Sequence, residues 1–414
     1  MLRRLLMCSL LATLAWACAA TAAAASPDRI TIGTLYASSG KFSQASTRQY
    51  DGLKFWVGEV NAQGGVFVKA FGKRIPVKLV AYNDQSSTTL AASLYNRLIT
   101  QDKVDILVAD YGSVLTSVAI PLARVHKKLL FDETGTSGKF FEPKDNNRYI
   151  VLTGLPTSSE WPKVLADFMH HVGIRKVAIL YASNDWSGSQ ADTLNSALKQ
   201  LGVDVTFYES VPDDTSSYST IIHRMAGGNP DAVAEFGYST NDIAFLQNYA
   251  SSGLSFNMVF VPNPALHFEV VRQAVGDATL SHVFSYVAPP LIRYNKQVNY
   301  GPTLDAFEKA YTAAGGKNID LSTVAGYNTG LILAKTLDTA PQFTQESMRD
   351  AIDTFSGKIF TLNGLFKVNA EGAQVGEALP VGQVLPDGNG LSLLPVYPTA
   401  NAAAKYVYPA PAAQ

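Results

Sequence analysis

The sequence predicts an α/β protein of two doubly wound lobes, each built on a parallel β-sheet and joined by a hinge that the chain crosses more than once. Its 414 residues exceed the roughly 100 to 200 residues of a single domain. With 47% hydrophobic and only 16% charged residues, the chain falls outside the disordered and coiled-coil classes. A strand–helix alternation runs through it twice, which is typical of parallel sheets with right-handed crossovers.

Residues 1–25 have the three-part pattern of a secretory signal peptide. Arg3 and Arg4 precede an apolar run over 5–17, and small residues follow over 19–25. The apolar run is shorter than the ~18 residues of a membrane span, so we expect a soluble protein released into the periplasm. Cleavage is expected after Ala25, with Ala23 as the alternative.

Both cysteines, Cys8 and Cys18, lie inside this segment, so the secreted chain would contain no disulfide. Acylation of Cys18 is the less favoured interpretation, because the bulky Trp16 stands where small residues are expected. The chain has 33 Lys and Arg against 34 Asp and Glu, a net charge of −1, and no basic run. Nucleic acid is therefore not an expected partner.

The first alternation predicts a lobe over residues 28–153, completed by 286–360. Strands are expected at 30–37, 75–82, 104–109 and 129–131, and helices at 50–60, 88–100 and 114–127. The first helix has apolar residues at helical spacing and ends before Gly64 and Gly65, a C-terminal stop signal. Residues 104–109 are a short apolar run between polar residues, as in a strand buried on both faces.

The second alternation predicts a lobe over residues 154–285, completed by 361–408. Strands are expected at 176–181, 204–208, 232–236 and 258–261, with helices between them. Three further helices, at 303–314, 322–337 and 345–355, have no strands of their own and are expected to return to one lobe. The segments 360–368 and 378–384 are expected to supply strands to the other lobe. Such repeated crossing predicts a hinge rather than a flexible linker.

The candidate binding residues follow the predicted strands, because ligands of open parallel sheets bind at the carboxyl ends of strands, beside the following helices. Free backbone N–H groups there favour an anionic group, and aromatic faces cover an apolar body. The candidates are Ser39, Tyr111, Ser113, Thr134, Gly135 and Thr136 in the first lobe and Trp186, Tyr238 and Asn263 in the second. Trp186 is expected to face a ligand, whereas Trp161 is expected to begin a helix.

Three carboxylates, Asp132, Glu133 and Asp185, also lie at strand ends. Asp132 and Glu133 are neighbours, so general acid–base chemistry is one interpretation, but helix capping and a surface salt bridge are favoured. The sequence has no Gly-x-Ser-x-Gly elbow and no Gly-x-x-x-x-Gly-Lys-Ser/Thr phosphate loop. Its six histidines lack metal-ligand spacing. We therefore expect no catalytic residues, no cofactor and no metal.

Several segments together resemble the periplasmic branched-chain amino acid binding proteins, whose lobes have the type I periplasmic binding fold. The segments are 29–33, 39–40, 50–52, 59–66, 80–85, 176–181 and 363–366. The Asn-Ala-x-Gly-Gly-Val element at 61–66 is the most specific of them, and the similarity covers essentially the whole mature chain. The resemblance implies a monomeric solute-binding protein of an ABC importer, which closes on a small-molecule ligand and presents it to a permease in the inner membrane.

The resemblance also implies roles for particular residues. Ser113 and residues 134–136 correspond to the hydroxyl and amide donors that hold the ligand carboxylate in the family, and Trp186 and Tyr238 correspond to its second-lobe aromatics. Asn263 stands where amino acid binders have an acidic residue for the ligand ammonium, and an amide cannot neutralise a buried charge. Either Asp132, Glu133 or Asp185 replaces that acid, or the ligand has no α-amino group. A small organic acid or amide with an apolar or aromatic body is favoured.

Two other functions remain open from the sequence. A ligand-sensing subunit of a signalling complex would share the fold and the pocket and differ only in its partner. A secreted hydrolase would use Asp132 and Glu133, and the substitution of either would abolish turnover rather than change affinity.

Overall fold

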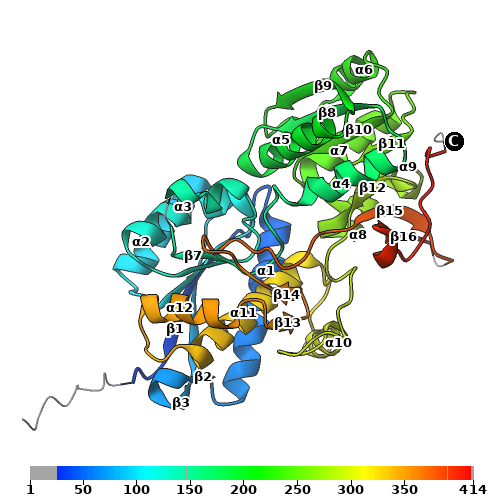
Figure 1. Ribbon diagram of the computed structural model, residues 1–414. Coiled ribbons are helices and arrows are strands. Elements are labelled where there is room, and N and C mark those ends of the chain that lie inside the picture. The colour runs from blue at the N-terminus through cyan, green and yellow to red at the C-terminus, as the bar shows by residue number, and fades with distance from the viewer. Residues whose placement is uncertain (1–25, 146, 389, 412–414) are drawn as a thin grey trace, which may run out of the picture.

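The computed structural model describes residues 26–145, 147–388 and 390–411, so the predicted signal peptide and the question of acylation at Cys18 lie outside the described residues. Two lobes lie end to end, and the chain passes between them three times, after β7 (Ile150–Leu152), after β12 (Phe284–Tyr286) and after β14 (Gly364–Phe366) (Figure 1). The predicted α/β fold with a multi-crossover hinge is thereby confirmed.

The first lobe is built on a five-stranded parallel sheet in the order β4-β1-β5-β6-β7. Its other strands are β1 (Ile30–Tyr36), β4 (Val77–Asn83), β5 (Ile106–Val108) and β6 (Leu130–Asp132). Its helices are α1 (Ser43–Ala62), α2 (Thr88–Thr100), α3 (Gly112–Val125), α10 (Leu304–Ala313), α11 (Leu321–Thr339) and α12 (Gln345–Phe355). The three late helices return to this lobe, as the sequence predicts.

Strand β5 shows how the apolar pattern positions the helices. Successive side chains of a strand point to opposite faces of the sheet. Leu107 accordingly packs in one hydrophobic cluster with Leu98 of α2 and Leu115 of α3, whereas Ile106 and Val108 pack in another with residues of α1 and α11. Helices therefore cover both faces of the sheet, and the carboxyl ends of its strands are left uncovered by this packing.

The second lobe is built on a seven-stranded sheet in the order β16-β15-β12-β11-β10-β8-β9. The strands β8 (Lys176–Ala182), β9 (Asp204–Val211), β10 (Ala232–Phe236), β11 (Met258–Phe260) and β12 are parallel, and β15 (Val381–Pro386) and β16 (Leu391–Tyr397) extend the edge in antiparallel pairing. Its helices are α4 (Trp161–His171), α5 (Asp185–Gln200), α6 (Ser219–Ala226), α7 (Ser239–Ala250), α8 (Pro264–Val275) and α9 (Asp277–Leu280).

One strand assignment from the sequence is wrong. Residues 360–368 do not join the second sheet; β13 (Ile359–Thr361) and β14 pair only with each other as an antiparallel hairpin. The chain reverses between Thr361 and Gly364, where the φ of +105° at Gly364 favours glycine. Ile359 and Phe366 then pack in the hydrophobic cluster of the first lobe. The other predicted segment, 378–384, overlaps β15 and does join the second sheet.

Small elements complete the chain. A hairpin of β2 (Val66–Val68) and β3 (Lys73–Ile75) encloses the 3₁₀ turn η1 (Lys69–Phe71), and further 3₁₀ turns lie at η2 (Gly138–Phe141), η3 (Pro143–Asp145) and η4 (Thr399–Asn401). Within the described residues, no helix combines the length and apolar character needed to cross a bilayer.

Candidate functional site

An enclosed cavity lies between the lobes, where the carboxyl ends of strands from both sheets face each other. It is lined from the first lobe by Tyr111, Gly112, Glu133, Thr134, Thr136, Leu321 and Ala325, from the crossover after β7 by Leu155, and from the second lobe by Trp161, Trp186, Tyr238 and Leu266. Its volume is about 20 Å³, little more than one water molecule requires. The lobes are therefore closed against each other in this conformation.

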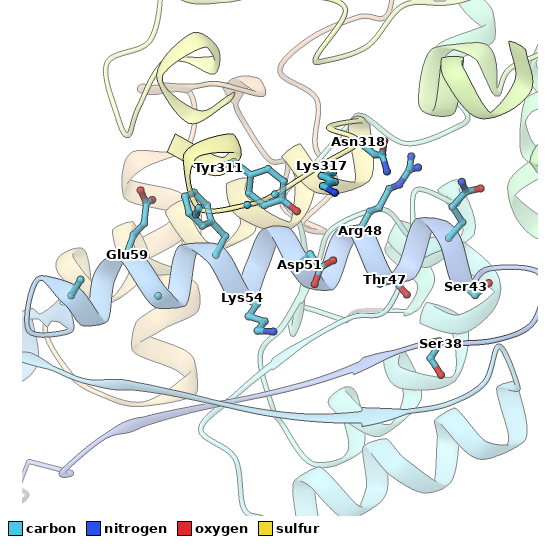
Figure 2. Close-up of a pocket in the computed structure, with 17 residues that line it drawn as sticks. Ser38, Ser43, Thr47, Arg48, Asp51, Lys54, Glu59, Tyr311, Lys317 and Asn318 are labelled. Carbon is cyan, nitrogen blue, oxygen red and sulfur yellow. The ribbon is translucent and has the colours of Figure 1, made fainter. Parts of the chain in front are cut away.

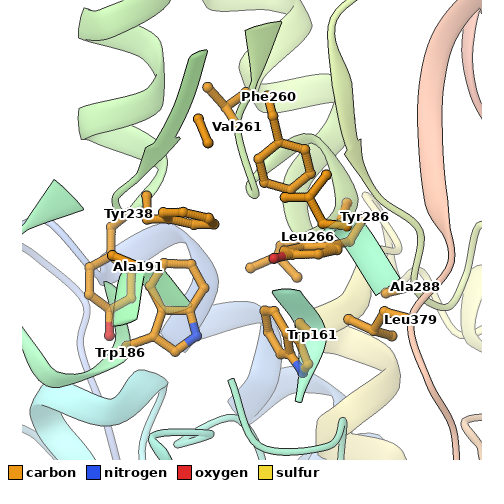
Figure 3. Close-up of a cluster of buried hydrophobic side chains, with 14 of the residues drawn as sticks. Trp161, Trp186, Ala191, Tyr238, Phe260, Val261, Leu266, Tyr286, Ala288 and Leu379 are labelled. Carbon is orange, nitrogen blue, oxygen red and sulfur yellow. The ribbon is translucent and has the colours of Figure 1, made fainter. Parts of the chain in front are cut away.

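Aromatic rings form the second-lobe wall of the cavity (Figure 3). Trp186 and Tyr238 stack with ring centroids 4.9 Å apart and an interplanar angle of 22°, and Trp161 meets Trp186 edge-on at 5.9 Å. All three rings are buried. Because stacked and edge-on pairs fix one another, the wall is a preformed apolar surface.

Hydroxyl and amide groups form part of the first-lobe wall. The Thr134 hydroxyl donates to Gln49 Oε1 at 2.6 Å and accepts from the Gly112 N–H at 2.9 Å. Gly112 has a φ of +74°, and a Cβ there would lie 3.2 Å from the Tyr238 hydroxyl. Thr136 presents a buried hydroxyl that has no hydrogen-bond partner among the described residues. These groups place polar atoms opposite the aromatic rings.

Glu133 is the one carboxyl among the described residues that line the cavity. Its side chain is 1% exposed, and neither carboxyl oxygen has a hydrogen-bond partner within the described chain. Burial raises the pKa of Glu133 well above its usual range, and the neighbouring carboxylates of Asp110 and Asp132 raise it further. Burial thus favours the uncharged form of Glu133 relative to a carboxyl in water.

Asp132 is buried beside Glu133 but does not line the cavity. Its Oδ1 accepts a hydrogen bond from the Gly135 N–H at 2.7 Å. Burial raises the pKa of Asp132 to about 8, although hydrogen bonds from the backbone of Gly135 and Thr134 act in the opposite direction. A Cβ on Gly135 would lie 2.7 Å from Asp132 Oδ2, so this glycine supports the loop rather than contacting the cavity.

Four other predicted residues are not brought to the cavity. Ser39 is exposed in a loop. Asp185 forms an exposed salt bridge with Lys139 at 2.5 Å. Ser113 is buried, and its hydroxyl accepts from the Ser137 N–H at 3.0 Å. These side chains belong to the rim or to the packing behind the wall.

Asn263 is the fourth. Its Nδ2 donates to the Gly237 carbonyl at 2.6 Å, and its Oδ1 accepts from the Ser239 hydroxyl at 3.1 Å. The side chain is fully buried within the second lobe. Its hydrogen-bonding groups therefore join the loop after β10 to the start of α8.

Sequence reasoning missed several lining residues. Trp161 does begin a helix, as expected, but it also lines the cavity, and its position after β7 is the signal that the strand-end rule could have used. Leu321 and Ala325 come from α11, which returns to the first lobe after a long excursion, and no local pattern places them there. Leu155 and Leu266 are apolar, so a search for polar and aromatic residues at strand ends does not select them.

A chain of buried polar groups bridges the lobes beside the cavity. The Tyr111 hydroxyl lies 3.1 Å from His267 Nε2, His267 Nδ1 lies 3.0 Å from Asp320 Oδ2, and Arg48 also pairs with Asp320. Burial would raise the pKa of Asp320, but the hydrogen bond and charge of His267 and the charge of Arg48 outweigh it and lower that pKa. His267 belongs to the second lobe and its two partners to the first.

A larger hollow of about 1150 Å³ lies on the outer face of α1 and is distinct from the cavity (Figure 2). Arg48, Asp51 and Lys54 line it together with Tyr311 and Lys317. All of these residues belong to the first lobe, and the hollow is open to solvent, which weakens the interaction of charged groups. It lacks the enclosure of the interlobe cavity. Within the described residues, no cluster of His, Cys, Asp and Glu is arranged to hold a metal.

Comparisons with known proteins place these features in context. The family model described as "periplasmic binding protein" matches residues 29–389. The Leu/Ile/Val-binding protein homolog 7 of Brucella melitensis is 22% identical over 398 residues, which cover 92% of this chain and 94% of that protein.

Solved structures are similar in fold. A solute-binding protein of an ABC transporter from R. palustris, in complex with 4-hydroxybenzoate, superposes with a TM-score of 0.75 at 16% identity, covering 93% of this chain and 98% of that one. The branched-chain amino acid transporter substrate binding protein of Streptococcus pneumoniae, in complex with isoleucine, superposes with a TM-score of 0.71 at 17% identity, covering 92% of this chain and all of that one.

Proposed function

Since the chain belongs to the periplasmic binding protein family, as its sequence motifs indicated, we propose that it captures one small organic solute between its lobes in the periplasm and delivers it to the permease of an ABC importer. Proteins of this family share a solute-binding fold.

The observation that carries the proposal is the composition of the cavity wall. Tyr111 and Thr134 come from one lobe, and Trp186 and Tyr238 come from the other. A ligand between them contacts both lobes only when they are closed, and it therefore stabilises the closed form by its differential affinity. Domain closure around a small molecule is the physical basis of capture.

The two walls differ in chemistry, and this difference favours an amphipathic ligand. We propose that an apolar or aromatic body lies against Trp186 and Tyr238, while a polar group faces Thr134 and Thr136. Isoleucine and 4-hydroxybenzoate, which the similar structures hold, are both small molecules with this division into an apolar body and a carboxylate. A ligand of that size exceeds the present volume of about 20 Å³, so the lobes must open to admit it, and the rings of the wall must shift when the lobes close around it.

A thermal-shift screen of small metabolites tests capture. Purified protein, dialysed to remove carried solutes, should be stabilised by one class of small organic compound, because a ligand that binds only the native state raises the unfolding temperature. A broad screen in which no solute stabilises the protein would contradict the proposal. Delivery is tested separately: deletion of the gene should abolish cellular uptake of the solute that binds, and unchanged uptake would favour a sensing role.

A further inference from the structure

Glu133 differs from the other polar groups of the cavity wall in having no partner. The hydroxyl of Thr134 is satisfied by Gln49 and Gly112, whereas both oxygens of Glu133 are buried without a hydrogen bond among the described residues. A buried polar group without a partner costs about 1 to 3 kcal/mol, and more if it is charged. Such a group on a binding wall is therefore suited to a partner that arrives with the ligand.

The protein's own basic side chains near the cavity are already paired. Lys41, behind the ring of Tyr238, pairs with Asp213. His267, behind Tyr111, is held by Asp320. Neither lines the cavity, and the described lining includes no Lys, Arg or His. A carboxylate that faced Glu133 would thus meet no positively charged side chain there.

The groups behind Glu133 are further carboxyls and not basic side chains. Asp110 accepts from the Ser46 hydroxyl and the Tyr111 N–H through one oxygen, and its carboxyl also interacts with that of Asp84. Asp132 accepts from the Gly135 N–H through Oδ1, and its Oδ2 has no partner among the described residues. When ionised, these carboxyls repel a negative group at Glu133, and none of them repels a positive one.

The aromatic rings of the cavity wall also favour a positively charged group on the ligand. The faces of Trp and Tyr rings attract cations, by about 0.5 to 2 kcal/mol for each contact. Trp161, Trp186 and Tyr238 line the same cavity as Glu133, and all three rings are shielded from water. An aromatic enclosure with one carboxyl suits an organic cation.

We propose that the ligand presents a protonated nitrogen, an ammonium or amidinium group, which pairs with Glu133 of the first lobe. This inference rests on the proposed function and specifies its ligand. It also decides among the three carboxylates that could replace the acid missing at Asn263: Asp132 does not line the cavity, and Asp185 lies on the surface with Lys139.

Compounds that share a carbon framework and differ in the charge of their polar group test the inference. Benzamidine, benzamide and benzoate share a phenyl ring, and isoleucine differs from 2-hydroxy-3-methylpentanoate in having an ammonium group in place of a hydroxyl. Calorimetric titration should show that the protonated member of at least one set binds at least tenfold tighter than its counterparts. Glu133→Gln should weaken the binding of that protonated compound at least tenfold. If none of these compounds binds, the first solute found in the metabolite screen and its analogue without the nitrogen replace them.

Glu235→Gln is the matched control. Glu235 is buried, its carboxyl interacts with that of Asp242 in its own lobe, and it lies outside the cavity lining. Its substitution should leave affinity within about twofold. If Glu133→Gln does not fold, titration of the unaltered protein in buffers of different ionisation enthalpy gives the answer. Pairing with a cation should release a proton from Glu133, whose titratable neighbours are Asp110, Asp132 and the phenols of Tyr111 and Tyr238.

The outcomes separate the inference from the proposed function. Tight binding of a solute without a protonated nitrogen, unaffected by Glu133→Gln or strengthened by it, would overturn the inference while capture stands. The inference would also be overturned if a cation bound with the same affinity to Glu133→Gln, or if its binding released no proton. Absence of binding by every solute in the metabolite screen would overturn the proposed function itself.

Discussion

At the residue scale, the cavity depends on a few side chains whose neighbours fix their chemistry. Trp186 is held by Tyr238 on one face and by Trp161 at its edge, so its ring is both part of the lobe interface and part of the cavity wall. Glu133 and Asp132 are adjacent in sequence, yet only Glu133 faces the cavity.

Replacement of Trp186 by alanine should weaken ligand binding by about 1 to 3 kcal/mol, because the ring that covers the apolar body is lost. Calorimetric titration with the ligand from the screen measures the change. Trp186→Phe, which keeps an aromatic face, should recover part of the affinity. Unchanged affinity in Trp186→Ala would remove this ring from the binding site.

Asp132 should make stability depend on pH. Its pKa is raised by burial to about 8 in the folded protein, so the folded state binds more protons than the unfolded state above pH ~4. Its contribution to stability is present in full below the unfolded pKa and is lost as the pH rises towards 8. The melting temperature should therefore fall from pH 5 to pH 8, and the fall should be smaller in Asp132→Asn. An equal fall in the variant would show that Asp132 does not titrate in this range.

At the element scale, the first lobe is held together by the contact between α1 and α11. The two helices approach so closely that a Cβ on Gly52 would lie 2.1 Å from the Thr323 carbonyl oxygen, and one on Gly326 would lie 2.0 Å from the Gln49 carbonyl oxygen. Nearly every residue over the first three turns of α11 is buried. The glycines thus allow a late helix to complete the early sheet, and that helix in turn brings Leu321 and Ala325 to the cavity.

Gly326→Ala should destabilise the protein by about 1 to 3 kcal/mol, since the added methyl group forces the two backbones apart. Denaturant titration measures the loss. Gly58→Ala is the matched control on α1, because a Cβ there meets nothing within 4 Å, and it should be neutral or slightly stabilising through helix propensity. Equal effects of the two substitutions would contradict the close contact of α1 and α11.

At the scale of the whole molecule, closure is maintained by polar contacts as well as by the aromatic wall. His267 interrupts the helical geometry of α8 with φ and ψ of −143° and 55°, and its ring reaches between Tyr111 and Asp320 of the other lobe. It lies outside the cavity lining. It can therefore change affinity only through the equilibrium between open and closed forms.

His267→Ala should lower ligand affinity by about tenfold, because a buried hydrogen bond to a charged group contributes roughly 1.5 kcal/mol or more to the closed form. Titration calorimetry measures the affinity, and small-angle scattering should show a larger radius of gyration for the variant without ligand. His223→Ala, at an exposed site on α6, is the control. Unaltered affinity and dimensions would show that the bridge does not hold the lobes closed.

The sequence by itself determined the doubly wound lobes and many residues of the cavity. Apolar periodicity and strand ends are local properties, so they indicated both alternations and placed Tyr111, Thr134, Trp186 and Tyr238 on facing edges. The same reasoning could not exclude Ser39 or Asn263, because a strand end supplies more polar side chains than one cavity can contain.

Only the tertiary structure decided which of these groups meet. Adjacent side chains point to different sides of the chain, so the choice between Asp132 and Glu133 depends on how the loop after β6 is held by Gly135. The hairpin of β13 and β14, the arrival of Leu321, and the bridge from Tyr111 through His267 to Asp320 join residues far apart in sequence. Such contacts are fixed by the packing of whole lobes, which leaves no trace in local periodicity.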